Sequence, residues 1–311
     1  MQTRVKMTLL ILAVVLATSL LVGCGATDST TDPGDPNPFA PARVGTDSTL
    51  EVMTWNLEHF AKEGAVTANH VIAAVEGLQV DIIALQEIES LTYFNRVREG
   101  LPGWTGDRAT SAYGGLNLAF LYPIDGEVQV TAVFEILTEY RTPLPRSPLV
   151  LEGNFRGTDF VVINNHYKCC GDNVINESNP WDEEVRRRDA SLLIDDFIRT
   201  NYPDRAVIVV GDLNDNISDL TNANVFQNFI DAPELYRFVD MAIAQREDVL
   251  WSFPSWPSHL DHILITNELF AGFEGPAALV QVVPLHNLIG GWSVYDKTLS
   301  DHLPVVLRLQ P

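Results

Sequence analysis

Short apolar runs recur along the chain, and most of them end in a cluster of polar side chains. The runs with the length and β-branched content of buried strands are residues 50–55, 80–85, 159–164, 206–210 and 303–309. These strand-like runs outnumber the long helical ones. The pattern therefore predicts a protein built mainly around β-sheet.

Two stretches show the spacing of an α-helix instead. Residues 66–78 place apolar side chains at helical intervals, and residues 181–199 are the clearest helical stretch. The second has acidic residues in its first turn, where the helix dipole favours them. Strands and helices together indicate the α/β (α+β) class.

The N-terminus, residues 1–23, has the parts of a secretory signal peptide. Arg4 and Lys6 precede an apolar run that ends in LVGC. This ending resembles the lipobox of bacterial lipoproteins, which implies cleavage before Cys24 and acylation of its thiol. Because the run is nearly long enough to span a bilayer, an uncleaved anchor is the alternative. We expect an exported protein that its lipid anchors to the bacterial cell envelope, at the outer membrane or the cell surface.

Residues 24–48 carry the lipidated cysteine and then a segment rich in Pro, Asp, Ser and Thr. The segment shows no apolar period, so we predict a flexible tether. The remaining residues, 49–311, suit one large domain, since neither an internal repeat nor a second linker is evident.

The composition is strongly acidic. The chain has 20 basic and 41 acidic residues, and loss of Arg4 and Lys6 with the signal peptide changes its net charge from −21 to −23. A protein that binds nucleic acid through charge alone would carry the opposite sign. An acidic surface suits a soluble exported protein or one that collects divalent cations.

Three cysteines are present, and two of them are adjacent. Cys24 belongs to the lipobox, whereas Cys169 and Cys170 follow a predicted strand. Exported proteins rarely keep free thiols, so we favour a vicinal disulfide between these two residues over free thiols. A zinc site is a weaker alternative, because adjacent thiols lack the usual ligand spacing.

Polar side chains stand at the ends of the predicted strands. Asp212 and Asn214 follow residues 206–210 at positions i and i+2, so on an extended chain they would share one face. The other strand-end residues are Asn56, Glu58, Gln86, Glu87, Asn165, His166, Asp261, Asp301 and His302. Hard oxygen ligands combined with imidazoles suit Mg²⁺, Mn²⁺ or Ca²⁺ and the metal-assisted hydrolysis of phosphate esters.

Six motifs occur in a fixed order along the chain: TWNLE, LQEIE, NHYK, VVGDLND, LDHILI and SDHLPV. Together they resemble the endonuclease/exonuclease/phosphatase superfamily, whose best-known member is DNase I, over about residues 49–310. The resemblance implies a four-layer αββα sandwich of two packed mixed β-sheets.

The same resemblance implies roles for the strand-end residues. The metal-site positions are Asn56, Glu58, Glu87 and Asp301, with Glu87 as a direct ligand. The catalytic positions are His166, Asp212, Asn214, Asp261 and His302. His302 matches the general base and Asp261 the acid that orients it. Asp212 and Asn214 match the pair that orients the nucleophile and holds the phosphate, and His166 matches the second histidine, which contacts the phosphate or assists the leaving group.

Two further positions are candidate phosphate contacts. Arg146 resembles the phosphate-contacting arginine of several members, and a solvated loop arginine is an equal alternative. Asn117 stands where members often place a polar residue facing the site. Residues 171–184 are dense in Asp, Asn and Glu and could hold a structural Ca²⁺, although a polar surface loop is favoured.

These observations predict a monomeric, divalent-metal-dependent phosphoester hydrolase, with an extracellular nuclease as the favoured activity and nucleic acid as its substrate. A phosphatase or a sphingomyelinase-like phospholipase C of the same fold is the alternative. A non-catalytic surface binding protein is less favoured, because every catalytic position is filled by a suitable residue.

Overall fold

The computed structural model describes residues 36–246 and 249–311, and residues 36–311 form one compact unit. The predicted signal peptide, Cys24 and the first part of the predicted tether lie outside the described residues. Among those described, no helix is both long and apolar enough to cross a bilayer.

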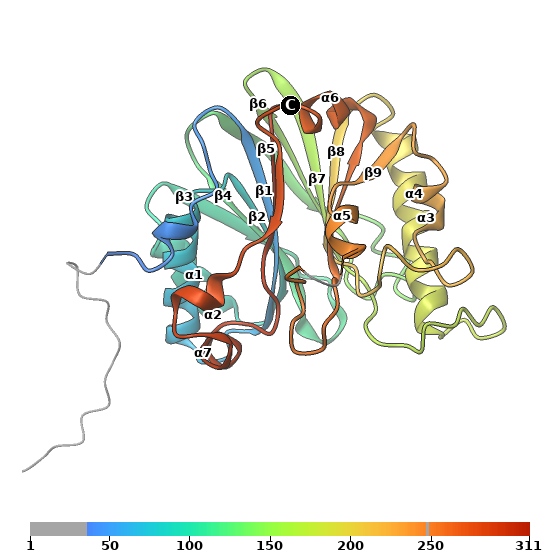
Figure 1. The fold of residues 1–311 in the computed structure, drawn as a ribbon, viewed down its shortest axis with the longest axis horizontal. Coiled ribbons are helices and arrows are strands. Elements are labelled where there is room, and N and C mark those ends of the chain that lie inside the picture. Colours follow the sequence, from blue (N-terminus) through green and yellow to red (C-terminus); the bar gives the residue numbers. More distant parts are fainter. Residues whose placement is uncertain (1–35, 247–248) are drawn as a thin grey trace, which may run out of the picture. The chain divides into compact units, whose positions relative to one another are not determined.

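Twelve strands form two six-stranded sheets (Figure 1). The first sheet has the order β11-β12-β1-β2-β4-β3 and the second β5-β6-β7-β8-β10-β9. The strands of the first sheet are β1 Leu50–Phe60, β2 Ile82–Ile88, β3 Trp104–Arg108, β4 Asn117–Pro123, β11 Leu279–Val282 and β12 Val305–Leu309. Those of the second are β5 Val128–Glu135, β6 Leu149–Phe155, β7 Thr158–His166, β8 Ala206–Asp212, β9 Tyr236–Phe238 and β10 Asp261–Thr266.

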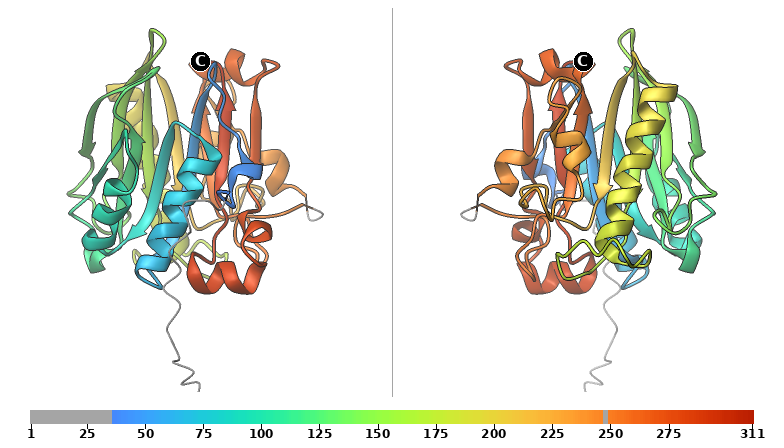
Figure 2. Two further views of the ribbon diagram at one scale, coloured as in Figure 1. Left: turned by 90° about the vertical axis from the view of Figure 1, so that its left-hand side faces the viewer. Right: turned by 90° about the vertical axis from the view of Figure 1, so that its right-hand side faces the viewer.

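Helices cover the outer faces of the two sheets. Figure 1 shows α1 and α2 beside the first sheet, and Figure 2 shows α3 lying across the second. The helices are α1 Ala65–Leu78, α2 Leu91–Glu99, α3 Glu183–Asn201, α4 Gln227–Ile230, α5 Met241–Ala244, α6 Phe270–Phe273 and α7 Trp292–Thr298. Short 3₁₀ helices occupy Ala40–Ala42, Tyr113–Gly115, Asn267–Leu269 and Leu285–Leu288. The predicted four-layer sandwich is confirmed.

Strand β8 shows why the apolar runs are continuous rather than alternating. Ile208 and Val210 belong to the core between the sheets, whereas Val207 and Val209 belong to the core beneath α3. Since successive side chains point to opposite faces, a strand buried on both faces must be apolar throughout.

The folded part begins earlier than predicted, because residues 36–48 are not a tether. Phe39 is fully buried and packs against α1, where its ring meets that of His70 at 6.4 Å between centroids. The N–H groups of Val44 and Gly45 both donate to the Leu78 carbonyl at the end of α1. The segment lacks a period because it contributes single side chains to the core instead of forming a long element.

Replacing Phe39 by alanine should therefore lower the free energy of unfolding by about 3–5 kcal/mol, the usual cost of emptying a buried aromatic site. Urea denaturation measures this directly. Phe134→Ala, at a side chain that is 39% exposed on β5, is the matched control and should cost much less. Equal losses in the two variants would mean that the segment is not part of the core.

Candidate active site

The strand-end residues meet at one edge of the sandwich, which we call the catalytic edge. The parallel pairs β1–β2 and β7–β8 end there. Their antiparallel neighbours β12 and β10 begin there. Residues that precede some strands and follow others in sequence thus come together in space.

His302 is held at this edge by Asp261. The imidazole Nδ1 lies 2.7 Å from Asp261 Oδ2, and both side chains are buried. Its Nε2 faces the other acids, 3.9 Å from an oxygen of Asp212 and 3.9 Å from one of Asp301. Because the Asp261 carboxylate accepts a hydrogen bond from Nδ1–H, Nε2 is the nitrogen at which His302 gains or loses a proton, and it points toward the centre of the site.

Charge around His302 controls its protonation. Burial alone would lower the pKa of the imidazole, but the negative charges of Asp261 and Asp212 raise that pKa to about 10. Burial raises the pKa of Asp212 to about 7, against the opposing effect of His302. In the protein without metal, the proton therefore stays on the histidine over the neutral pH range.

Asp212 lies at the centre of the constellation. Its Oδ2 accepts a hydrogen bond from Asn56 Nδ2 at 2.9 Å and lies 3.5 Å from His166 Nε2. Its Oδ1 accepts from the backbone N–H of Asn214 at 3.0 Å. One carboxylate thus joins residues from both sheets.

The side chains of Asp212 and Asn214 do not lie on one face of an extended chain. β8 ends at Asp212, and Asn214 has a left-handed φ of 55°. Its side-chain amide donates to the Tyr167 carbonyl at 3.3 Å. The expectation of two side chains on one strand face is therefore wrong in its geometry, although both residues lie at the catalytic edge.

Glu87 joins the site through Asn56 and His166. Glu87 Oε1 lies 3.4 Å from Asn56 Nδ2 and 3.8 Å from His166 Nε2. The Asn56 oxygen is occupied, because it accepts the Glu58 N–H at 2.9 Å. Asn56 therefore presents its amide nitrogen to the carboxylates of Asp212 and Glu87 and orients them.

Glu58 and Asp301 form the other side of the site. Glu58 Oε2 accepts the Asp301 N–H at 2.9 Å and also pairs with Lys62. Burial raises the pKa of Asp301 to about 6, and the charge of Glu58 adds to this effect. Glu58 thus fastens the segment that carries Asp301 to the end of β1.

Arg146 and His166 form a buried pair beside Asp212. Arg146 Nη2 donates to His166 Nε2 at 2.9 Å, which places the histidine proton on Nδ1. Burial, together with the charge of Arg146, moves the pKa of His166 well below its usual value. His166 is therefore a neutral residue that holds the guanidinium, and its Nε2 has no proton to give a leaving group.

The sequence profile of the endonuclease/exonuclease/phosphatase family matches residues 53–302. This chain belongs to that family. The matched region runs from β1 to His302 and contains every strand-end residue of the catalytic edge. The family includes metal-dependent nucleases and phosphatases, so the chain is a phosphoester hydrolase by fold. No curated protein matches the chain significantly.

Solved structures of the family share the fold at low sequence identity. D. rerio TDP2 in complex with a single-strand DNA product is 16% identical with a TM-score of 0.62, covering 85% of this chain and 100% of that one. The Bacteroides vulgatus endonuclease/exonuclease/phosphatase is 16% identical with a TM-score of 0.59, covering 84% and 98%. The human Nocturnin catalytic domain with bound sulfate is 16% identical with a TM-score of 0.56, covering 84% and 93%.

The side chains at the catalytic edge suit the divalent metal that the family implies. Glu87 lies near the end of β2 and Asp301 in the segment before β12, the two strands that flank β1. Both are hard oxygen donors, and carboxylates are preferred ligands of Mg²⁺ and Ca²⁺. The raised pKa values of Asp212 and Asp301 reflect burial among other acids. A bound cation would relieve this excess of negative charge.

Strained backbone marks the same edge. Glu58, His59 and Glu87 all adopt left-handed φ angles, of 37°, 49° and 61°. Such conformations cost free energy in residues other than glycine and gather at functional sites in proteins. The hydrogen bond from the His59 N–H to Glu87 Oε2, at 2.9 Å, links two of these residues.

Arg146 is suited to bind a phosphoryl oxygen. The side chain is only 8% exposed, and its buried Nε has no hydrogen-bond partner among the described residues. A buried unpaired N–H is costly, so a substrate oxygen would stabilise it. The geometry favours the phosphate contact over the solvated loop arginine.

Arg146→Lys should keep the charge but remove the planar fork of donors, and should lower kcat/KM about tenfold to a hundredfold. Steady-state kinetics on a phosphodiester substrate measure this. Arg141→Lys, in the same loop, is the control and should change kcat/KM little. A fully active Arg146→Lys variant would remove this residue from the phosphate site.

Asn117 does not have the predicted role. Its Nδ2 donates to the Gly115 carbonyl at 2.9 Å, and its Oδ1 accepts the Ala112 N–H at 3.3 Å. Both ends of the amide are thus used to close the loop before β4. The side chain is a structural cap, which the sequence position alone did not reveal.

The predicted vicinal disulfide is wrong. Cys169 and Cys170 are free thiols whose sulfur atoms lie 3.0 Å apart, well beyond a covalent bond. The loop is held by other contacts, since the buried Arg187 donates to the carbonyls of Lys168 and Cys170. These hydrogen bonds position the loop without a cross-link.

Residues 171–184 show the features of a polar loop rather than those of a calcium site. Glu184 is buried, pairs with Arg187 at 3.2 Å and accepts the Asn173 N–H at 2.7 Å. Asp182 caps α3 by accepting the Val185 N–H. Protein donors already satisfy both carboxylates.

Ser300 is a site residue that the sequence analysis missed. Its hydroxyl donates to the Asn56 carbonyl at 2.6 Å and accepts the His302 N–H at 2.9 Å. It thereby ties the base to the end of β1. Its position directly before Asp301 and His302 was the available signal.

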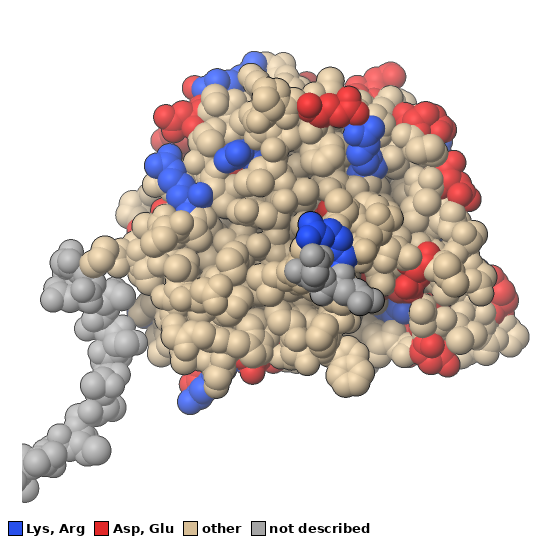
Figure 3. Space-filling model, in the orientation of Figure 1, with Lys and Arg blue, Asp and Glu red and all other residues tan. Residues whose placement is uncertain are grey.

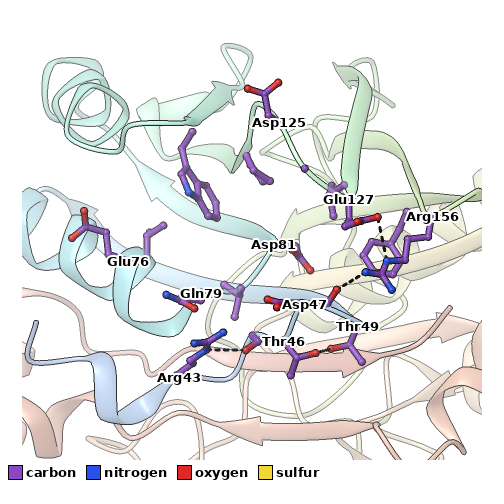
Figure 4. Close-up of a pocket in the computed structure, with 18 residues that line it drawn as sticks. Arg43, Thr46, Asp47, Thr49, Glu76, Gln79, Asp81, Asp125, Glu127 and Arg156 are labelled. Atoms are coloured by element: carbon purple, nitrogen blue, oxygen red, sulfur yellow. Dashed lines mark hydrogen bonds and ion pairs between the residues drawn. The ribbon is translucent and has the colours of Figure 1, made fainter.

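A cavity of about 730 Å³ lies away from the catalytic edge (Figure 4). It is lined by residues at the opposite ends of the strands, including Thr49 before β1, Asp81 before β2 and Arg156 after β6. None of the residues that line it belongs to the catalytic edge.

Proposed function

We propose that this protein is a divalent-metal-dependent phosphodiesterase that cleaves nucleic acid. The observation that carries the proposal is the His302–Asp261 pair, in which Nδ1 is held by Asp261 while Nε2 faces Asp212 and Asp301. A base oriented by one carboxylate and surrounded by hard oxygen ligands is the arrangement that metal-assisted phosphoester hydrolysis requires.

The roles follow from the geometry. His302 accepts a proton from the attacking water at Nε2, and Asp261 keeps the other proton on Nδ1 and stabilises the imidazolium that forms. Arg146 binds a phosphoryl oxygen, while Asn56 holds Asp212 in place beside it. Glu87 and Asp301 would hold the divalent cation, which supplies positive charge to offset that of the transition state.

Stacking, rather than charge, supports nucleic acid as the substrate. Three aromatic side chains on loops of the catalytic edge are highly exposed: Tyr113, Trp181 and Trp256. Aromatic platforms of this kind bind unpaired bases. Figure 3 shows basic and acidic side chains scattered over one side of the molecule. The net charge of −21 disfavours recognition of a duplex backbone through charge alone. The similar TDP2 structure contains a single-strand DNA product, which also supports single-stranded rather than duplex nucleic acid as the proposed substrate.

A phospholipid phosphodiesterase is the second candidate. The loops after β7 and β8 expose Val174 and Leu220, which are 60% and 79% accessible. Apolar side chains on the edge that receives substrate suit a lipid surface.

The test is to incubate residues 36–311 with Mg²⁺ or Mn²⁺ and a panel of phosphoesters. The panel contains single-stranded and duplex DNA, RNA, sphingomyelin vesicles and inositol phosphates, with His302→Ala as the control. We expect cleavage of single strands by wild type only. Cleavage of sphingomyelin alone would select the second candidate, and no cleavage of any substrate would favour a binding protein.

We also propose that the mature chain begins at a lipidated Cys24 and is anchored to the cell envelope. Mass spectrometry of the wild-type protein expressed in a bacterium should show the loss of residues 1–23. Cys24→Ser should leave the chain unprocessed or release it from membranes. Wild-type protein that retains residues 1–23 would contradict the proposal.

A further inference from the structure

A fully buried carboxylate, Asp240, lies behind the catalytic edge and belongs to none of the groups described above. Its Oδ2 accepts hydrogen bonds from His259 Nε2 at 3.0 Å and from His262 Nδ1 at 2.6 Å. Its Oδ1 accepts the Ile263 N–H at 3.1 Å. Asp240 thus holds His259 and His262, the residues immediately before Leu260 and immediately after Asp261.

Ser252 connects the segment 259–262 to the segment that carries the general base His302. Its hydroxyl oxygen accepts the N–H groups of Leu260 and Asp261, each at 3.1 Å. Its carbonyl accepts the Leu303 N–H at 2.7 Å, directly after His302. One fully buried serine therefore holds the backbone on both sides of the Asp261–His302 hydrogen bond.

The hydrogen-bond partners of His259 and His262 determine which of their nitrogens carry protons. Both nitrogens of His262 face acceptors, Asp240 Oδ2 and the Asp215 carbonyl at 2.9 Å, so His262 is an imidazolium. His259 Nδ1 accepts the Ser252 N–H at 3.4 Å, so its proton is on Nε2. Burial acts to lower the pKa of His262, but the charge of Asp240 overcomes it and raises that pKa.

Asp240, His259 and His262 also have the composition of a metal site, with three ligand atoms within 4.8 Å of one another. A metal would need the lone pair of His259 Nε2, which carries the proton donated to Asp240. It would also displace the proton from His262 Nδ1. The hydrogen bonds account for all three side chains without a cation.

We propose that Asp240 and Ser252 are positioning residues, which hold Asp261 and His302 at hydrogen-bonding distance through this buried network. The kinetic part rests on the proposed function. The structural part does not, because the Asp261–His302 hydrogen bond exists without substrate.

The experiment uses residues 36–311 and the variants Asp240→Asn and Ser252→Ala. The first variant replaces the carboxylate by an amide, which directs an N–H₂ group or a weaker acceptor at two imidazole donors. The second removes the shared acceptor of the Leu260 and Asp261 N–H groups. Asp182→Asn, which alters a helix cap away from the network, is the matched control for a general loss of stability. The low-field proton resonance of His302 Nδ1 is recorded without substrate and assigned by its loss in His302→Ala.

We expect both network variants to shift or broaden this resonance while Asp182→Asn leaves it unchanged. On the substrate found by the panel, kcat should fall about tenfold to a hundredfold with little change in KM, since small displacements of reacting groups cost this much. Should Asp240→Asn not fold, Ser252→Ala decides by the same readouts.

Two results would overturn the proposal. The first is a folded network variant with an unchanged resonance and unchanged kcat. The second is one equivalent of tightly bound transition metal in wild type, found by elemental analysis, that Asp240→Asn lacks. A protein inactive on every substrate would refute the proposed function and leave the resonance test intact.

Discussion

Replacing His302 by alanine should lower the rate of phosphoester hydrolysis by about a hundredfold or more, the usual contribution of a positioned general base. His302 Nε2 is the group that faces Asp212 and Asp301, and the variant leaves no other imidazole with a free lone pair at that point among the described residues. His166 cannot replace it, because its Nε2 is bound to Arg146.

Asp261→Asn should lower the rate as well, and the double variant should be little slower than His302→Ala alone, because the two residues act as one unit. The neutral imidazole is the base, so the wild-type rate should rise with pH toward the raised pKa of His302. Removal of the Asp261 charge lowers this pKa. The rise should therefore move to lower pH in Asp261→Asn.

Rates of wild type, both single variants and the double variant under one set of conditions form the test. His70→Ala, on α1 and remote from the edge, is the control and should retain full activity. If the two single losses simply multiply in the double variant, His302 and Asp261 are not coupled and the assignment of the base and its orienter is wrong.

Glu87→Gln should lower activity about a thousandfold at a fixed, low Mg²⁺ concentration, since a bound cation contributes several kcal/mol to the transition state. The variant removes a full negative charge from the centre formed with Asn56 and Asp212. Higher Mg²⁺ should recover part of the loss. Activity measured as a function of metal concentration, with EDTA as the zero point, gives the shift.

Glu89→Gln is the matched control, because Glu89 directly follows the strand that carries Glu87. Its carboxylate lies 2.8 Å from Nδ1 of the exposed His59 and does not contact Asn56 or Asp212. Its metal dependence should equal that of wild type. Equal behaviour of the two variants would remove Glu87 from the metal site. Full wild-type activity in excess chelator would contradict the metal requirement altogether.

Local sequence determined the strands and the residues at their ends. A strand buried on both faces must be apolar throughout, so runs such as 206–210 were visible without any tertiary information. The polar residues that follow them mark where each strand leaves the core. For this reason Glu87, Asp212, Asp261 and His302 could be named as site residues from their positions and from the motifs around them.

The partners of those residues were decided by tertiary structure. Phe39 joins the core although residues 36–48 show no period, because a single buried ring needs no repeat. His166 became an acceptor for Arg146, 20 residues away, through a contact that no local pattern announces. Asn117, by contrast, closes its own loop through contacts with residues two and five positions away.

Asp240 and Ser252 carry no motif. Most of their hydrogen bonds lie within residues 240–263, whereas the bond from the Leu303 N–H to the Ser252 carbonyl joins them to the segment before β12 and exists only once the two sheets have packed together. The sequence by itself determined which residues reach the catalytic edge, because strand ends depend on local polarity. Only the folded structure decided which donor meets which acceptor there, because hydrogen bonds depend on distances between segments that are far apart in the chain.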